Sequence, residues 1–414
     1  MSRPSCPIIS QITHQQRLRL LLGLVAAVCE LSGQPPPSVP VPAPVGIPVP
    51  LTTPAPEPGR SGPGARFSLD GTVYRQRVNP NSTVVRNGLL PPLQPLIDLH
   101  IRDTIIRPGG DGYYYLTGST GADIWHQNTT GIELWRSTDL QTWDYLGVVW
   151  NLAREGTWEP QHVTGTKYAR TLWAPEIVYI KRLKNYFLTY SMPPGDRGIL
   201  KSSTGKPEGP YVNALADNGK LAGEIDLSLF EDDDGTVYAT WGPAYIARMK
   251  DDLSGLAEER HNPELLHPDL DPTHHATTSI TRGYKDIGHE GPCLFKRNGK
   301  YYLTAADTYL GRYSSLVAVS DHVYGPYDLR HEAVPGGGGG DYFQDNAGSW
   351  WCTYFGNDGA APFREMPALV KVEFDADGKI HVAKTQPDFV LLESARYGRS
   401  PWSAKPATPA PAVP

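Results

Sequence analysis

A strand pattern that recurs five times constrains the fold of this chain more than any other feature. Each copy is a run of aromatic and β-branched residues that contains one threonine, and each follows a turn that carries Gly, Asp or Asn. The five threonines are Thr117, Thr189, Thr240, Thr304 and Thr353. A polar turn that leads into such a run is the sequence signature of a β-hairpin. The chain is therefore predicted to contain five similar β units rather than a helical bundle.

The spacing of the five units indicates how they are arranged. They follow one another at intervals of roughly 50 to 70 residues, with three or four strands each and no convincing long helix between them. A β-sandwich gives no reason for five similar units, and a parallel β-helix repeats at a much shorter period. We therefore predict an all-β fold, a five-bladed β-propeller.

Gly and Pro are abundant, at 42 and 40 of 414 residues, but they are unevenly distributed. Residues 1–33 are expected to be a signal peptide, because Arg17 and Arg19 precede an apolar run too short to span a bilayer. Residues 34–66 form a Pro-rich linker, residues 67–390 the propeller, and residues 391–414 a Pro/Ala-rich tail. We expect a secreted or periplasmic protein without a transmembrane domain. Acylation of Cys29, as in a lipoprotein, is the alternative.

Charge and cysteine content narrow the range of partners. A formal net charge of −6 argues against a nucleic-acid partner. Cys293 and Cys352 are the two cysteines of the presumed folded part, and no Cys or His spacing is typical of zinc. The sequence therefore predicts no metal site, two buried thiols, and a monomer.

Acidic residues stand at related positions in three of the five units. Counting back 14 residues from the repeat threonine reaches Asp103, Asp226 and Glu290. The first strand of a propeller blade lines the axis, so equivalent positions face one another there. Converging carboxylates raise the pKa of at least one group, and a glycosidase needs one protonated acid and one ionised base. The alternative is that these acids are turn residues or partners of nearby arginines.

Several motifs resemble glycoside hydrolase family 43. They are WAPE at 173–176, IDLSLFEDDDG at 225–235 and HEGPCLFKRNGKYYL at 289–303, together with Asp103 at the start of the first unit. The resemblance covers about residues 95–385. It implies a five-bladed propeller and inverting hydrolysis of arabinosides, xylosides or related sugars. It also implies that Asp103 is the general base, that Glu290 is the general acid, and that Asp226 tunes the pKa of Glu290 and orients it.

The chain departs from the pattern of that family at three places. Thr104 and Leu227 stand where the family usually has Pro, and the run from Gly336 to Gly340 stands where its fifth blade often offers a His associated with calcium. No cofactor is expected to be required, and a structural calcium at the axis is doubtful. These departures support an alternative, a carbohydrate-binding propeller without catalysis. A structural scaffold for protein partners is a further alternative.

Three further residues are predicted to bind an oligo- or polysaccharide substrate. Trp173 begins WAPE near the axis, where a sugar ring can stack on it, and Trp125 and His126 belong to a loop at the propeller mouth. His289 is expected to point away from Glu290, because neighbouring side chains on a strand alternate between faces. The expected substrates are α-L-arabinofuranosides or β-D-xylosides, with galactosides as an alternative. An inverting mechanism predicts that the carboxyl groups of Asp103 and Glu290 lie about 6.5–9.5 Å apart.

Overall fold

The computed structural model describes residues 65–67, 73–75, 79–97, 99–121, 129–162, 171–275 and 285–387. All of them belong to one compact unit, Gly62–Pro414. Among them, β1 (Ala65–Phe67) and β2 (Val73–Arg75) form a two-stranded antiparallel hairpin. The predicted signal peptide and the C-terminal tail lie outside the described residues, as does nearly all of the predicted linker.

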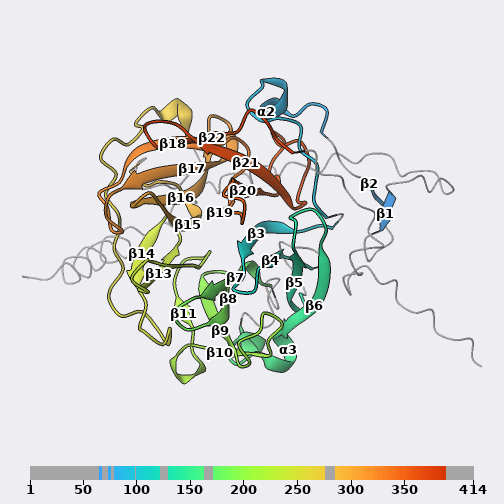
Figure 1. Ribbon diagram of the computed structural model, residues 1–414, viewed down its shortest axis with the longest axis vertical. Coiled ribbons are helices and arrows are strands. Elements are labelled where there is room, and N and C mark those ends of the chain that lie inside the picture. Colours follow the sequence, from blue (N-terminus) through green and yellow to red (C-terminus); the bar gives the residue numbers. More distant parts are fainter. Residues whose placement is uncertain are drawn as a thin grey trace, which may run out of the picture. The chain divides into compact units, whose positions relative to one another are not determined.

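The other strands form five antiparallel sheets, called blades I to V, arranged around a common axis (Figure 1). Blade I contains β3 (Arg102–Pro108), β4 (Tyr114–Ser119), β5 (Gly131–Ser137) and β6 (Asp144–Asn151). Blade II contains β7 (Trp173–Ile180), β8 (Asn185–Met192), β9 (Asp196–Ser202), β10 (Tyr211–Asn213) and β11 (Leu221–Ala222). Blade III contains β12 (Ser228–Glu231), β13 (Val237–Trp241) and β14 (Tyr245–Arg248). Blade IV contains β15 (Glu290–Arg297), β16 (Lys300–Tyr309), β17 (Arg312–Ser320) and β18 (Asp328–Val334). Blade V contains β19 (Tyr342–Gln344), β20 (Trp350–Tyr354), β21 (Ala368–Phe374) and β22 (Ile380–Val382).

The prediction of an all-β, five-bladed propeller is confirmed. Every repeat threonine lies on the second strand of its blade, on β4, β8, β13, β16 and β20. Helices in the described ranges are short, among them α2 (Thr83–Arg86) and α3 (Leu152–Glu155). No helix of these ranges is long and apolar enough to cross a membrane.

The hydrophobic core lies between neighbouring blades as well as within them. Trp150 of β6 and Tyr190 of β8 are both fully buried, and their rings stack with centroids 5.3 Å apart between blades I and II. Thr189 of blade II donates a hydrogen bond to the carbonyl oxygen of Leu227, which precedes β12, at 2.6 Å. Thr240 of blade III donates to the carbonyl of Pro292 on β15 at 3.3 Å. Two of the repeat threonines therefore join one blade to the next.

In each blade, a residue of left-handed backbone conformation stands at the second position of the inner strand or just before the strand. These residues are Asp103 (φ 49°), Ala174 (φ 43°), Asp226 (φ 60°), Gly291 (φ 59°) and Gly339 (φ 72°). In blades I, II and IV the strand pairing shifts at the same place. Asp103 and Asp226 are therefore equivalent, as the count of 14 residues predicts. Glu290 lies one residue before the left-handed position, because the hairpin of blade IV is one residue shorter: Cys293 pairs with Thr304, whereas in blade I Ile105 pairs with Thr117.

The segment that precedes blade I runs along blade V and closes the ring. The backbone N–H of Leu96 donates to the carbonyl of Pro367 at 2.7 Å, and that of Ile101 donates to the carbonyl of Glu365 at 3.0 Å. Nearer its start, the N–H of Asn79 donates to the carbonyl of Pro362 at 2.7 Å. Blade V is itself built from consecutive strands. Residues 79–101 thus connect the last blade to the first without adding a strand to it.

Candidate active site

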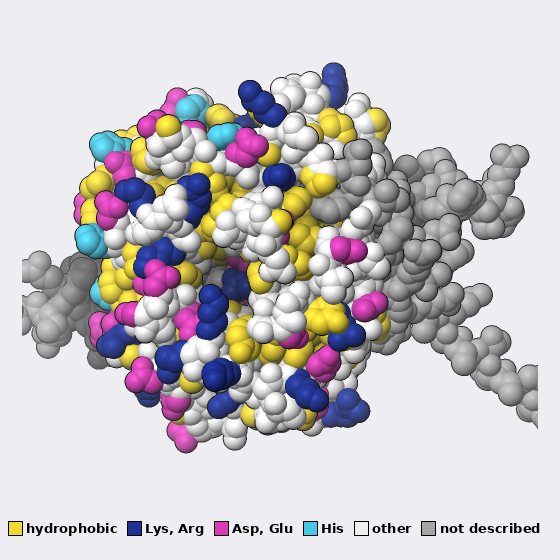
Figure 2. All heavy atoms as spheres, in the orientation of Figure 1, with side chains coloured by type: hydrophobic (Ala, Val, Ile, Leu, Met, Phe, Trp, Pro, Cys, Tyr) yellow, Lys and Arg dark blue, Asp and Glu magenta, His cyan; other side chains and the backbone are white. Residues whose placement is uncertain are grey.

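A pocket of about 170 Å³ lies at the axis, where the inner strands begin. Asp103 of blade I, Asp226 just before blade III and Glu290 of blade IV line it, with Trp173 and Tyr313 among the other lining residues. In space-filling form, charged side chains of both signs are visible in the central depression of this face (Figure 2). The structure therefore brings together all three carboxylates that the sequence singled out, together with Trp173. Trp125 and His126 lie outside the described residues.

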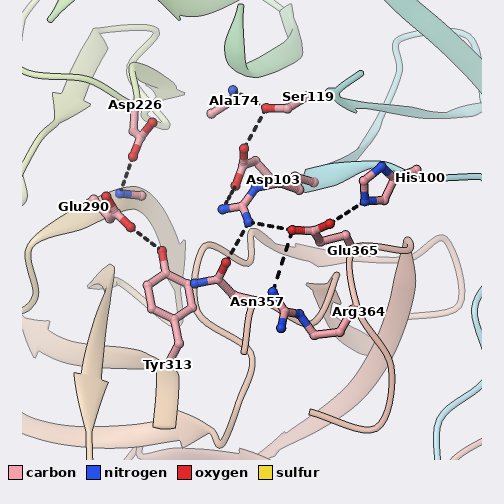
Figure 3. Close-up of polar contacts among 12 residues, drawn as sticks. His100, Asp103, Ser119, Ala174, Asp226, Glu290, Tyr313, Asn357, Arg364 and Glu365 are labelled. Atoms are coloured by element: carbon pink, nitrogen blue, oxygen red, sulfur yellow. Dashed lines mark hydrogen bonds and ion pairs between the residues drawn. The ribbon is translucent and has the colours of Figure 1, made fainter. Parts of the chain in front are cut away.

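Asp103 is held by groups on both sides of its carboxylate (Figure 3). Ser119 of β4 donates a hydrogen bond to Oδ2 at 2.6 Å, and Nη2 of Arg102 lies 3.8 Å from Oδ1. Burial raises the pKa of Asp103, and the charge of Arg102 and the hydrogen bond from Ser119 offset only part of that rise. Because the side chain is nevertheless anchored in one orientation, it can present a fixed oxygen to a water molecule.

Arg102 connects Asp103 to the loop between β20 and β21. Its Nη1 donates to Oδ1 of Asn357 at 2.7 Å and lies 3.2 Å from Oε1 of Glu365. Glu365 also pairs with His100 and lies 3.8 Å from Nη2 of Arg364. Burial would raise the pKa of Glu365, but the hydrogen bond with His100 and these positive charges lower it to about 2. Glu365 is therefore an ionised anchor that fixes the guanidinium beside Asp103.

Glu290 receives two side-chain contacts on the same oxygen. Tyr313 of β17 donates its hydroxyl hydrogen to Oε1 at 2.7 Å, and Nε2 of His289 lies 3.3 Å from that atom. Burial would raise the pKa of Glu290, but these two contacts and the charges of His289 and Arg102 lower it. The sequence suggested instead that Glu290 itself stays protonated.

Asp226 has the opposite electrostatic environment. Its Oδ2 accepts a hydrogen bond from the backbone N–H of Gly291 at 2.9 Å. Burial, followed by the negative charges of Glu290 and Asp103, raises its pKa well above the ordinary range. Glu290 accepts from the Tyr313 hydroxyl and lies beside the imidazole of His289, whereas Asp226 accepts from one backbone N–H. Of these two carboxyl groups, Asp226 is therefore the one that holds a proton more tightly.

His289 does not point away from Glu290, so that expectation is wrong. Alternation of side chains holds along a regular strand, but β15 carries a bulge between Glu290 and Cys293, and His289 stands before its first residue. The ring lies between Glu290 and Asp307 of β16, with Nδ1 3.1 Å from Oδ1 of Asp307. Burial would lower the pKa of His289, but the two carboxylates raise it to about 10.

Three residues that contact the carboxylates of the pocket were missed or misplaced in the sequence analysis. Arg102 stands directly before Asp103, so that its proximity could have been noticed. His289 was assigned to the wrong face of its strand. Tyr313 gave no signal, because it reaches Glu290 from β17 of the same blade, and only the hairpin pairing brings it there.

A buried ion-pair cluster lies beside the pocket on the same inner strands. Arg107 of β3 pairs with Asp341 (Nε to Oδ2, 2.6 Å) and with Glu176 of β7 (Nη2 to Oε2, 3.0 Å). Burial raises the pKa of Glu176 to about 8, because Arg107 offsets this only in part and Asp341 adds a second negative charge. These residues do not fit a calcium ion beside Arg107, since the guanidinium already supplies the positive charge. No cluster among the described residues, this one included, has three or more His, Cys, Asp or Glu side chains that could hold a metal ion.

Comparison with known proteins confirms the resemblance noted in the sequence. A β-D-galactofuranosidase of Aspergillus niger is 30% identical over 207 residues, which cover 46% of this chain and 51% of that protein. A xylosidase/arabinosidase of Humicola insolens is 26% identical over 258 residues, which cover 59% and 42%. The chain thus spans about half the length of these curated relatives.

An endo-1,4-β-xylanase structure from Bacteroides thetaiotaomicron shares the fold, with a TM-score of 0.53 and 23% identity over 71% of this chain and 97% of that one. The family model described as glycosyl hydrolases family 43 matches residues 93–380, from just before β3 to the start of β22. Because this match reaches all five blades and covers more than half of the sequence, the chain belongs to glycosyl hydrolases family 43.

Proposed function

We propose that this chain is an inverting glycoside hydrolase that cleaves α-L-arabinofuranosides or β-D-xylosides. The observation that carries the proposal is the convergence of Asp103, Asp226 and Glu290, from three different blades, in one pocket. A binding protein has no need of three partly buried carboxylates, because like charges that converge without a purpose are costly. Membership of family 43 supports the same conclusion.

Each carboxylate has a proposed role. Asp103 is the general base that takes a proton from the attacking water, and Glu290 is the general acid that protonates the departing oxygen. Asp226 accepts the N–H of Gly291, the residue that follows Glu290, and so orients the acid and influences its proton affinity. Inversion requires space for water between base and sugar, which is the reason to expect a separation of about 6.5–9.5 Å.

The stereochemical outcome tests the proposed mechanism independently of the substrate. Proton NMR recorded during the first minutes of hydrolysis should show the product anomer opposite to that of the substrate. Formation of the same anomer would contradict the inverting mechanism and favour a nucleophilic role for one carboxylate.

The sugar is proposed from the substrates named for relatives, which include xylosides and arabinosides. A second candidate, β-D-galactofuranosides, is favoured by the 30% identity to the Aspergillus niger enzyme. A panel of aryl arabinofuranosides, xylosides, galactosides and galactofuranosides, with arabinan and xylan alongside, distinguishes them. Sugar binding without product release on any of these would favour the carbohydrate-binding alternative. Export to the periplasm or the medium suits a polysaccharide substrate. Both export and the monomeric state remain predictions.

The substitution Glu290→Gln tests the assignment of the acid. Loss of a general acid lowers the rate by about 10²- to 10⁴-fold for a glycoside whose leaving group needs protonation. The melting temperature should stay close to that of the unaltered protein, because Gln has the same size and accepts the Tyr313 hydroxyl. Glu373→Gln, at an exposed position of β21, is the matched control and should leave turnover unchanged. Full turnover in Glu290→Gln would exclude Glu290 as the acid.

A further inference from the structure

His289 occupies a position that the established family assignment does not explain. Its ring bridges two carboxylates, with Nε2 3.3 Å from Oε1 of Glu290 and Nδ1 3.1 Å from Oδ1 of Asp307. Asp307 is almost fully buried, and its Oδ1 also accepts the backbone N–H of Thr308 at 2.7 Å. The side chain of His289 is itself 37% exposed, so that one part of the ring reaches solvent.

We propose that the acid of this site is the pair formed by His289 and Glu290, in which His289 carries the proton that Glu290 delivers to the departing oxygen. This inference rests on the proposed function and deepens it. His289 acts through Glu290, so it is a positioning and proton-supplying residue, while Glu290 alone meets the glycosidic oxygen.

The groups around His289 favour a ring that holds its proton. They come from the four strands of blade IV: Glu290 of β15, Asp307 of β16, Tyr313 of β17 and Arg330 of β18. The ring centroids of His289 and Tyr313 are 6.2 Å apart. Arg330 contributes a positive charge near Asp307. Two carboxylates contact the imidazole directly, and they raise the pKa of His289 to about 10 while the pKa of Glu290 is lowered. Across neutral pH the pair therefore retains one proton, located mainly on the ring.

The proton transfer balances without any added reagent. The Nε2–H bond of His289 breaks as an O–H bond forms on Glu290, and that O–H bond breaks as the departing oxygen takes the proton. His289, now neutral, regains its proton at Nε2 from the solvent, to which its side chain is partly exposed. The proton that Asp103 removes from the attacking water returns to solvent, so the site ends the cycle in its starting state.

Dependence on the leaving group separates this role from a structural one. Aryl glycosides of the sugar selected by the panel are compared, from 2,4-dinitrophenol, which departs without protonation, to phenol, which needs it. His289→Gln keeps an N–H near Glu290 but cannot titrate. It should lower kcat/KM about 100-fold for the phenyl glycoside and only a few fold for the dinitrophenyl glycoside, in the range expected for lost acid catalysis.

The pH profile provides a second readout with a definite sign. Above neutral pH, activity falls when the pair of His289 and Glu290 releases its proton. Glu290 and Asp307 raise the pKa of His289, so this alkaline limb lies at a higher pH than it would without them. In His289→Gln this limb is set by Glu290 alone, so it should move to lower pH. Asp307→Asn keeps an acceptor for Nδ1 but removes the charge, and should move the limb in the same direction by a smaller amount. His274→Gln is the control, because His274 forms a similar pair with Asp269 (Nδ1 to Oδ2, 2.7 Å) away from the pocket.

Failure of this inference can be distinguished from failure of the proposed function. If Glu290→Gln shows the leaving-group dependence but His289→Gln retains full activity on the phenyl glycoside, Glu290 acts alone and the pair is wrong. An equal loss on both aryl glycosides, or an alkaline limb that stays in place, also overturns the pair. If Glu290→Gln is equally impaired on both glycosides, the assignment of Glu290 as the acid is itself wrong.

Discussion

A single hydroxyl group, that of Ser119, joins the carboxylate of one blade to the backbone of the next. It donates to Oδ2 of Asp103 at 2.6 Å and accepts the N–H of Ala174 at 2.8 Å. Ser191 lies at the corresponding place in blade II, two residues after its repeat threonine, and accepts the N–H of Asp226 at 2.7 Å. Both serines accept a hydrogen bond from the backbone N–H of a left-handed residue of the next blade. Ser119 in addition donates to the carboxylate of Asp103 in the pocket.

Ser119→Ala is therefore expected to change the acidic limb of the pH profile. The hydrogen bond from Ser119 favours the ionised form of Asp103. Without this hydrogen bond the pKa of Asp103, which burial already raises, should rise further. A general base works only above its pKa, and the limb should move to higher pH. A hydrogen bond to a charged group contributes about 1.5–3 kcal/mol, which corresponds to roughly one pH unit or more.

Ser191→Ala is the comparison for this experiment. It loses the same kind of backbone contact and should lose stability by a similar amount, but its acidic limb should stay where it is in the unaltered protein. If both variants shift the limb equally, the effect comes from blade packing and not from the contact with Asp103.

At this scale the sequence could predict the carboxylates but not their surroundings. Counting from the threonines located Asp103 and Asp226, because both stand at the same left-handed position. The same count reaches Glu290, but the left-handed residue of blade IV is Gly291, because the hairpin from β15 to β16 is one residue shorter than that of blade I. The bulge in β15 follows from backbone conformation and leaves little trace in residue types, which is why His289 was placed on the wrong side of Glu290.

Among the elements, the run from Gly336 to Gly340 has a physical explanation in close packing. A Cβ at Gly338 would lie 2.4 Å from the ring of Tyr313, and one at Gly340 would lie 2.4 Å from the carbonyl oxygen of Thr353. Gly339 adopts φ 72°, which L-residues with a side chain rarely adopt. The run thus lets the chain pass against the tyrosine that holds Glu290. In the sequence it stood out only as a departure from the family pattern.

Gly338→Ala should damage catalysis through this contact. The added methyl group must displace the Tyr313 ring, and with it the hydroxyl that donates to Glu290, so that kcat should fall by about tenfold or more. Gly359→Ala is a suitable control, because a Cβ there meets nothing within 4 Å. Turnover by both variants is measured with the same aryl glycoside. Equal activities would show that Tyr313 can move without consequence for the acid.

Across the whole molecule, Arg107 links four of the five blades at the axis. It extends from β3 to Glu176 of blade II, to Ser228 and Leu229 of blade III, and to Asp341 at the start of blade V. Removing one partner from a buried ion pair costs about 3–5 kcal/mol, because a charge remains without compensation. The sequence predicted the ring of blades but not this cluster, since its members are far apart along the chain.

Arg107→Met is expected to lower the thermal unfolding temperature markedly at neutral pH. The loss should grow as the pH rises above about 8, because Glu176 then ionises without a guanidinium to balance its charge. Arg248→Met, at a half-exposed position of β14, should change the unfolding temperature little. An unfolding temperature in Arg107→Met equal to that of the unaltered protein at pH 7 would show that water reaches the carboxylates of Glu176 and Asp341.

The way in which residues 79–101 close the ring has a consequence for how activity arises during synthesis. Asp103 belongs to the first blade. Its neighbour Arg102 is fixed by Asn357 and Glu365, which both belong to the last blade. A ribosome-bound chain that has released only four blades already contains Asp103, Asp226 and Glu290, and lacks the loop that completes their setting. Hydrolysis by nascent chains of increasing length should therefore begin only once blade V has emerged, which makes enzymatic activity a direct assay for ring completion.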